Sequence, residues 1–155
     1  MAKRSAGLVV YHYNEKNVLK VLLVHPGGPF FTKKDNGVWS IPKGEYNDDD
    51  DALTVARREF EEETGNRIQD EKFIPLTSVK LSSGKIITAW AVNDYFETPF
   101  ISSNLFEMEW PPKQGKRQWF PETDKARYFT IEEAKIKLYE SQHPFMDKLV
   151  EILKE

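Results

Sequence analysis

The chain has 155 residues, a formal net charge of −3, 30% charged residues and no cysteine. Disulfides, thiolate metal sites and cysteine nucleophiles are therefore excluded, and the mildly acidic balance gives no basic field for duplex nucleic acid. No apolar run approaches the roughly 18 residues of a membrane span, and Lys3 and Arg4 precede no signal-like apolar stretch, so we expect a single cytoplasmic domain over residues 1–155 with no membrane partner.

Short runs rich in β-branched and aromatic residues predict strands. In chain order they cover residues 7–13, 18–25, 38–42, 72–81, 85–92, 94–101 and 126–130, of which 94–101 is a strand or only an edge. The first two runs are separated by four residues, which predicts a hairpin. Loops are predicted for the Gly- and Pro-rich segment 25–37, for the polar segment 44–51 and for residues 102–118.

Capping residues set the predicted helix ends. Asp51 caps a helix that runs to Thr64, and Gly65 suits the left-handed position that ends many helices. Thr130 opens a second helix with Glu133 three positions on, which is the pattern of a capping box. A last helix covers about 144–153. We therefore predict a mixed α/β fold in which helices cover a sheet.

The segment REFEEETG (58–65) crowds four glutamates into two turns. At about 100° per residue, Glu59 and Glu63 continue the buried stripe of the helix, Glu62 lies beside them and Glu61 points to solvent. Burying like charges is costly, and a divalent cation with oxygen ligands removes that cost. The alternative is a solvated acidic helix face whose counterions are Arg57 and Arg58.

Fixed spacing around this helix carries a family resemblance. Gly44, five residues, Asp50, seven residues and REFEEETG resemble the Nudix box, the signature of hydrolases acting on nucleoside diphosphates linked to another group. WSIPKG (39–44) ahead of the box is also typical of the family. Asp50 stands where the family has Glu, and Asn66 stands where it has an apolar residue.

The resemblance implies a Nudix-type α/β/α sandwich with a mixed β-sheet flanked by helices. It also implies that Mg²⁺ or Mn²⁺ binds Glu59, Glu62, Glu63 and the backbone carbonyl of Gly44. Arg58 is expected to orient these carboxylates by pairing with the loop carboxylate. That partner is Asp50, or in its place Asp48, Asp49 or Glu45.

The implied chemistry is attack of metal-activated water on a pyrophosphate link. The general base is Glu62 or Glu59, and the alternative is a glutamate from a loop. Glu107 or Glu109, in the late loop, is the candidate for a further ligand or base, and the sequence does not choose between them.

Five residues are candidate contacts to a small-molecule nucleotide substrate: Lys43, Trp39, His25, Lys116 and Arg117. Lysines and arginine would neutralise phosphates, and Trp39 could stack on a base. For Trp39 the competing interpretation is packing in the core, and for His25 it is a residue at a strand end.

The sequence thus predicts a metal-dependent hydrolase that cleaves the pyrophosphate linkage of a nucleoside triphosphate or dinucleoside polyphosphate. The tyrosine that diadenosine tetraphosphate hydrolases carry shortly after the box is absent, because residues 82–84 are Ser, Ser and Gly. The alternative is a catalytically silent Nudix fold that binds a nucleotide or a protein. Substrate identity and oligomeric state stay open.

Overall fold

The computed structural model describes residues 3–154, so Met1, Ala2 and Glu155 of the expected domain lie outside the described residues. A mixed six-stranded sheet has the order β4-β5-β1-β2-β8, and β3 pairs with β1. Its strands are β1 (Arg4–Tyr13), β2 (Leu19–Pro26), β3 (Lys43–Tyr46), β4 (Ile74–Lys80), β5 (Ile86–Asn93) and β8 (Thr123–Thr130). Strands β1 and β5 run parallel and the other pairs are antiparallel.

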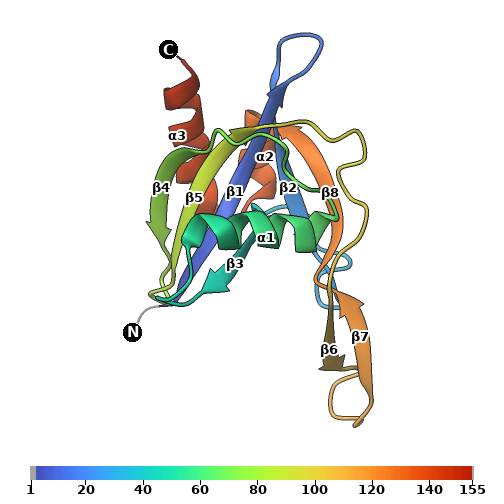
Figure 1. Cartoon of the computed structure of the whole chain (residues 1–155). Helices are drawn as coiled ribbons and strands as arrows, with labels where there is room; N and C mark the ends of the chain where they lie inside the picture. The colour runs from blue at the N-terminus through green and yellow to red at the C-terminus, as the bar shows by residue number, and fades with distance from the viewer. Residues whose placement is uncertain (1–2, 155) are drawn as a thin grey trace.

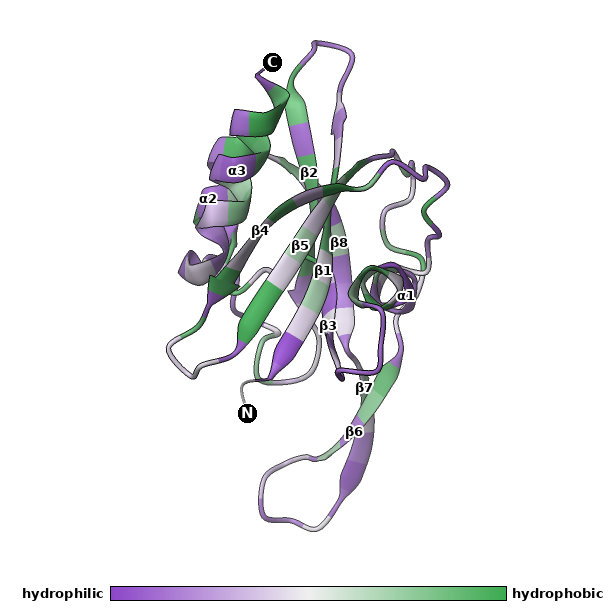
Figure 2. Ribbon diagram, turned by 60° about the vertical axis from the view of Figure 1, so that its left-hand side comes forward, coloured by the Kyte–Doolittle hydropathy of each residue, from purple (hydrophilic) through white to green (hydrophobic). Residues whose placement is uncertain are grey.

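Helices cover both faces of the sheet (Figures 1 and 2). Helix α1 (Ala52–Thr64) lies on one face, and α2 (Ile131–Lys137), the 3₁₀ turn η1 (Glu140–Gln142) and α3 (His143–Leu153) belong to the other. Side chains alternate along β1, so Leu8 packs in the core with Phe60 of α1, and Val9 packs in the core with Phe145 of α3. This arrangement confirms the predicted α/β/α sandwich.

The predicted helix ends are confirmed. The side chain of Asp51 accepts a hydrogen bond from the backbone N–H of Thr54, and Gly65 has a φ of 81°, in the left-handed region. Thr130 and Glu133 form both hydrogen bonds of the capping box. Local sequence therefore determines where α1 and α2 begin.

Four loop and strand predictions are wrong at least in part. Residues 38–42 make only isolated bridges, through Trp39 and Ser40, and 94–101 contain no strand. The predicted loop 102–118 instead contains most of a hairpin, β6 (Leu105–Glu109) and β7 (Arg117–Pro121). The polar KGEY becomes β3, because Ala6 and Ser5 at the start of β1 pair with it. Tertiary pairing forms β3 without an apolar pattern.

No helix within residues 3–154 combines the length and the apolar character needed to cross a membrane.

Candidate metal and active site

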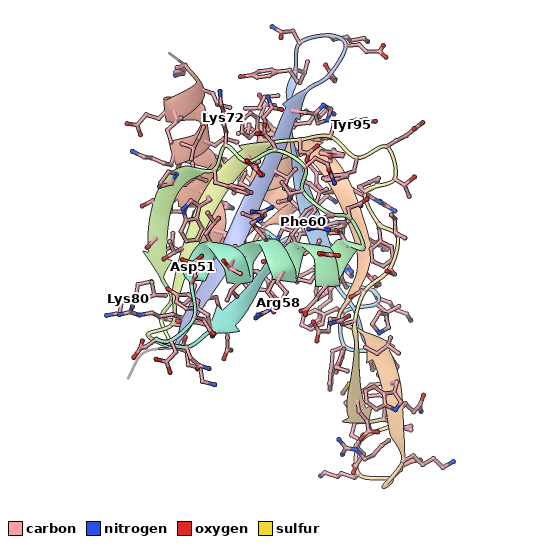
Figure 3. All side chains as sticks on the ribbon, in the orientation of Figure 1. Asp51, Arg58, Phe60, Lys72, Lys80 and Tyr95 are labelled. Carbon is pink, nitrogen blue, oxygen red and sulfur yellow. The ribbon has the colours of Figure 1, made fainter. Side chains whose placement is uncertain are left out.

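Helix α1 directs its glutamates as the helical periodicity predicts. Phe60 is fully buried in the core below the helix, whereas Glu59, Glu62 and Glu63 are half-buried and Glu61 is exposed. Phe60 and Arg58 leave α1 on different sides (Figure 3). Three carboxylates are thus held at the edge between the helix and the sheet.

Gly44 in β3 is the close neighbour of the Glu59 carboxylate. A Cβ at position 44 would overlap both the carboxylate oxygen Oε1 of Glu59 and its Cδ carbon, so a glycine is required for this approach. The other oxygen of Glu59, Oε2, is buried and has no hydrogen-bond partner among residues 3–154. A buried carboxylate oxygen without a partner destabilises the fold unless a hydrogen-bond donor or a cation binds it.

Crowding raises the proton affinity of these carboxylates. Burial is the largest cause that raises the pKa of Glu59 to about 7. A side-chain hydrogen bond with Glu62 and the negative charge of Glu62 also raise it. The pKa of Glu63 is raised well above its ordinary value, mainly by burial, although Lys43 opposes the shift. One Glu63 oxygen accepts a hydrogen bond from the backbone N–H of Lys43 at 2.8 Å.

Glu122 is a fourth carboxylate at this site, which the sequence analysis missed. Its pKa is raised by partial burial and then by the negative charge of Glu62. The main chain fixes it there: Glu122 N donates to Asn104 O at 2.8 Å, and Asn104 N donates to Glu62 O at 3.0 Å. A single acid between β7 and β8 has no spacing relation to the box, so no sequence signal could have singled it out.

Arg58 does not pair with Asp50 as predicted. Its Nε lies 3.9 Å from Glu62 Oε1, whereas Asp50 accepts a hydrogen bond from the backbone N–H of Asn47. Asp50 is one methylene shorter than the glutamate of the family pattern and instead closes its own turn. Of the suggested substitutes, Glu45 pairs with Lys85. Glu62 is therefore the cluster carboxylate that Arg58 approaches.

Lys43 is the predicted substrate contact that the structure brings to the carboxylates. Its side chain is largely buried, and its pKa is lowered by burial and then by Lys85, against the opposing effect of Glu63. A groove of about 810 Å³ opens beside β3, and its lining combines Lys3 and Arg4 with Glu45, Asp48 and Asp49. Lys43 is therefore the cation that the structure brings next to the carboxylates, and the groove itself is of mixed charge.

Trp39 and His25 are not available to a substrate. Trp39 is 2% exposed, its Nε1 donates to Asp35, and its ring packs in the core against Phe129. His25 is fully buried, and its ring nitrogens contact Asp124 Oδ1 and the Lys34 carbonyl oxygen, each at 2.6 Å. Both predicted contacts are corrected to structural roles, because burial and hydrogen bonding occupy these side chains.

The structure does not bring Glu107, Glu109, Lys116 or Arg117 to the carboxylate cluster. They belong to the β6–β7 hairpin and its turn, which projects from the body of the molecule (Figure 1). Glu107 pairs with Arg117, and Glu109 accepts a hydrogen bond from the backbone N–H of Lys113. These carboxylates are satisfied locally, which is the physical reason to remove them from the candidate site.

The residues at the cluster fit a divalent cation. All the side-chain donors are oxygens, Glu59 Oε2 lacks a partner among the described residues, and the missing side chain at Gly44 lets the Glu59 carboxylate lie against β3. Within residues 3–154, however, no three acidic or histidine side chains already converge as a metal site, and Glu63 is turned to the Lys43 N–H. Binding would therefore require side-chain rotation, and ligation by these residues stays a prediction.

Comparison with known proteins places this geometry in a family. The model of the NUDIX domain matches residues 1–150. The chain belongs to the Nudix family. The match confirms the resemblance seen in the sequence and supports a pyrophosphohydrolase in general.

Solved structures of Nudix proteins share the fold. A Caenorhabditis elegans Ap4A hydrolase is 20% identical with a TM-score of 0.63, over 97% of this chain and 98% of that one. The NUDIX domain of Shewanella oneidensis NrtR, complexed with ADP ribose, is 16% identical with a TM-score of 0.66, over 99% and 89%. A MutT/nudix family protein from Listeria innocua is 17% identical with a TM-score of 0.66, over 98% and 94%. No curated protein matches the chain.

Proposed function

We propose that the chain is a metal-dependent Nudix hydrolase that cleaves the pyrophosphate linkage of a nucleoside triphosphate or dinucleoside polyphosphate. The observation that carries the proposal is Glu59, which is pressed against Gly44 with one buried oxygen unpartnered. A silent binding module has no need to maintain that unfavourable arrangement.

Glu59, Glu62, Glu63 and the Gly44 carbonyl would hold Mg²⁺ or Mn²⁺, and Glu122, whose pKa is raised in part by the charge of Glu62, is a candidate to join them. When bound, the cation neutralises phosphate oxygens and holds the attacking water. Arg58 keeps Glu62 oriented through their contact. Lys43 supplies positive charge on the β3 side, and the proton of the water passes to one of the carboxylates, with Glu59, Glu62 and Glu122 as the candidates.

The substrate class is supported by two similar structures. The Caenorhabditis elegans protein is an Ap4A hydrolase, and the Shewanella oneidensis domain is complexed with ADP ribose. Both ligand names describe nucleotides whose phosphates are linked to another group. We extend that class to this chain, for which a cytoplasmic location also stays a prediction.

A nucleotide panel tests the proposal. Nucleoside triphosphates, dinucleoside polyphosphates and ADP-ribose would be incubated with the protein in the presence of Mg²⁺, of Mn²⁺ and of a chelator, with products separated by chromatography. We expect cation-dependent cleavage of at least one of them. The variant in which Glu59, Glu62 and Glu63 are all replaced by Gln should be inactive, and turnover that survives both the chelator and this variant would contradict the proposal.

A further inference from the structure

The β6–β7 hairpin is attached to the candidate site at its base. It projects as a two-stranded ribbon from the body of the protein (Figures 1 and 2). Its two ends, Asn104 and Glu122, are joined by a backbone hydrogen bond, and Asn104 is bonded in turn to Glu62 of α1. The base of the ribbon is therefore tied to the helix that carries the carboxylates.

The loop 27–37 lies against this ribbon and is anchored at both ends. Gly27 N donates to Glu122 O at 2.9 Å, and the Gly28 position faces the ring of Phe106. Toward its other end, the buried His25 contacts the Lys34 carbonyl, and Trp39 donates to Asp35. Anchoring at these points restricts where the middle of the loop can lie.

That anchored loop presents Phe30, whose side chain is 56% exposed. Its ring meets Trp110 edge-on, with centroids 5.2 Å apart and planes at 79°. Phe30 lies three residues beyond Gly27, so their Cα atoms are at most about 10 Å apart. An edge-on aromatic pair keeps a ring face free, and a planar ligand can stack there.

The two segments that supply this aromatic pair carry several exposed lysines, although the whole chain has a net charge of −3. Exposed lysines lie in the loop, Lys33 and Lys34, and in the turn of the hairpin, Lys113 and Lys116. The nearby carboxylates are engaged: Glu107 pairs with Arg117, and Glu109 binds a backbone N–H in the turn. Aromatic rings in segments that also carry lysines suit a ligand with a planar base and an anionic chain.

We infer that Phe30 and Trp110 form a stacking platform for a nucleobase of the substrate. This inference rests on the proposed function of the carboxylate cluster, where the phosphates would lie. The base is recognised by its ring face, so the platform accepts different bases and favours nucleotides over phosphate compounds that lack a base.

The hairpin offers a matched control. Trp119 pairs with Glu107 and Phe120 pairs with Phe106, so alternation puts Trp119 on the opposite face from Phe106 and Trp110. Trp119 is 63% exposed, so its replacement removes a comparable aromatic side chain without touching the platform.

The test uses binding in the presence of Mg²⁺, measured by titration calorimetry. The probes are α,β-methylene-ADP, which resists cleavage between its phosphates, and methylenediphosphonate, which has no base. We expect Phe30→Ala and Trp110→Ala to weaken binding of the nucleotide at least about fivefold and to leave binding of methylenediphosphonate unchanged. Trp110→Phe should retain most of the nucleotide affinity, and Trp119→Ala should change neither affinity.

Failure of the inference is distinct from failure of the proposed function. If the wild type binds the nucleotide but cleaves no substrate, and the platform variants do not bind the nucleotide, the platform is supported and the proposed hydrolysis is contradicted. The platform is overturned if the wild type does not bind the nucleotide, if both probes weaken equally, or if Trp119→Ala matches Phe30→Ala. Because Phe30 is exposed, melting temperatures within a few degrees of wild type are expected and would confirm that the variant is folded.

Discussion

The glutamates of α1 and those of the β6–β7 hairpin have the same side chain and close spacing, yet their surroundings differ. Glu107 and Glu109 each have a partner from the hairpin itself, an arginine side chain and a backbone N–H. Glu59 is instead pressed against Gly44, has an unpartnered oxygen, and lies within reach of two other carboxylates.

The difference shows what makes an acidic segment a candidate metal site. Charge density alone does not, because a carboxylate with a nearby cation or N–H is already stabilised. A divalent cation stabilises most those carboxylates that are half-buried, close to one another, and short of hydrogen-bond donors and cationic side chains. The comparison can be tested by changing the charges or the partners of the carboxylates in either region.

Removing a carboxylate from α1 should have the largest effect. Glu62→Gln should reduce turnover at least about 10²-fold, because it removes a predicted metal ligand and candidate base while the fold is kept. The exposed Glu61→Gln, one residue away, should stay within about threefold of wild type. Steady-state kinetics on the best substrate of the panel measures both variants. Equal losses of turnover would mean that the side of the helix on which a glutamate lies does not determine its importance for catalysis.

Gly44→Ala tests the surroundings of Glu59 without changing any charge. The new Cβ would displace the Glu59 carboxylate, and a displacement of about 1 Å in an active site can cost about 10²-fold. We expect a loss of turnover of about 10- to 100-fold and a lower melting temperature. The double variant Gly44→Ala with Glu59→Ala removes the clash and should recover much of the melting temperature, but not the turnover. A single variant with wild-type turnover would contradict the role of this contact.

Particular residues show how far the sequence could lead. Box spacing and helical periodicity identified Glu59, Glu62 and Glu63 as the inward face, because these are local properties of one helix. Glu122 could not be found, since the pairing of β8 with β2 and the bond to Asn104 bring it to α1. Strand β3 was missed for the same reason: its pairing with β1 is decided by tertiary structure.

The correction of His25 has a related cause. In the sequence alone, a histidine at a strand end beside glycines is a reasonable candidate for a phosphate contact. In the structure its ring contacts Asp124, which is distant in sequence, and the carbonyl of Lys34, which the loop 27–37 brings back to it. In the hairpin, charged residues mask the apolar alternation that would predict strands. Local patterns thus predicted the helices and the box. Strand β3, the position of Glu122 and the burial of His25 depend on contacts between residues that are distant in the sequence or brought together by loops.

Metal binding should appear as a change in stability. In the proposed site Mg²⁺ would bind the native cluster and not the unfolded chain, so at one hundred times its Kd it should stabilise the fold by about 2.7 kcal/mol. For a domain of this size that corresponds to about 5–10 °C in melting temperature. Replacing Glu59, Glu62 and Glu63 together by Gln should abolish the response and raise the metal-free melting temperature, because repulsion is removed. A wild type that does not respond to millimolar Mg²⁺ would place the metal elsewhere.

The same measurement has a defined pH dependence. The pKa of Glu59 is raised to about 7 in the folded state, so between about pH 4.5 and 7 the folded protein holds a proton that the unfolded chain has released. In that window the contribution of Glu59 to metal-free stability falls as pH rises, and the raised pKa of Glu63 acts in the same direction. The Mg²⁺-dependent shift should therefore grow from pH 5 to pH 8, since fewer protons compete for the oxygens. A shift that is larger at pH 5 would exclude these carboxylates as the ligands.

The smallest effect is expected in the hairpin. Glu107→Gln removes one partner of an exposed ion pair with Arg117, and such pairs contribute about 0–1 kcal/mol to stability. Melting temperature should change by only a few degrees, and turnover should stay within about threefold, because Glu107 faces away from the proposed stacking platform and is paired within the hairpin. Arg117→Gln is the reciprocal control and should behave alike, since either change breaks the same pair. If Glu107→Gln instead lost as much turnover as Glu62→Gln, the hairpin would have to close onto the cluster during catalysis, and local compensation would no longer separate the two acidic regions.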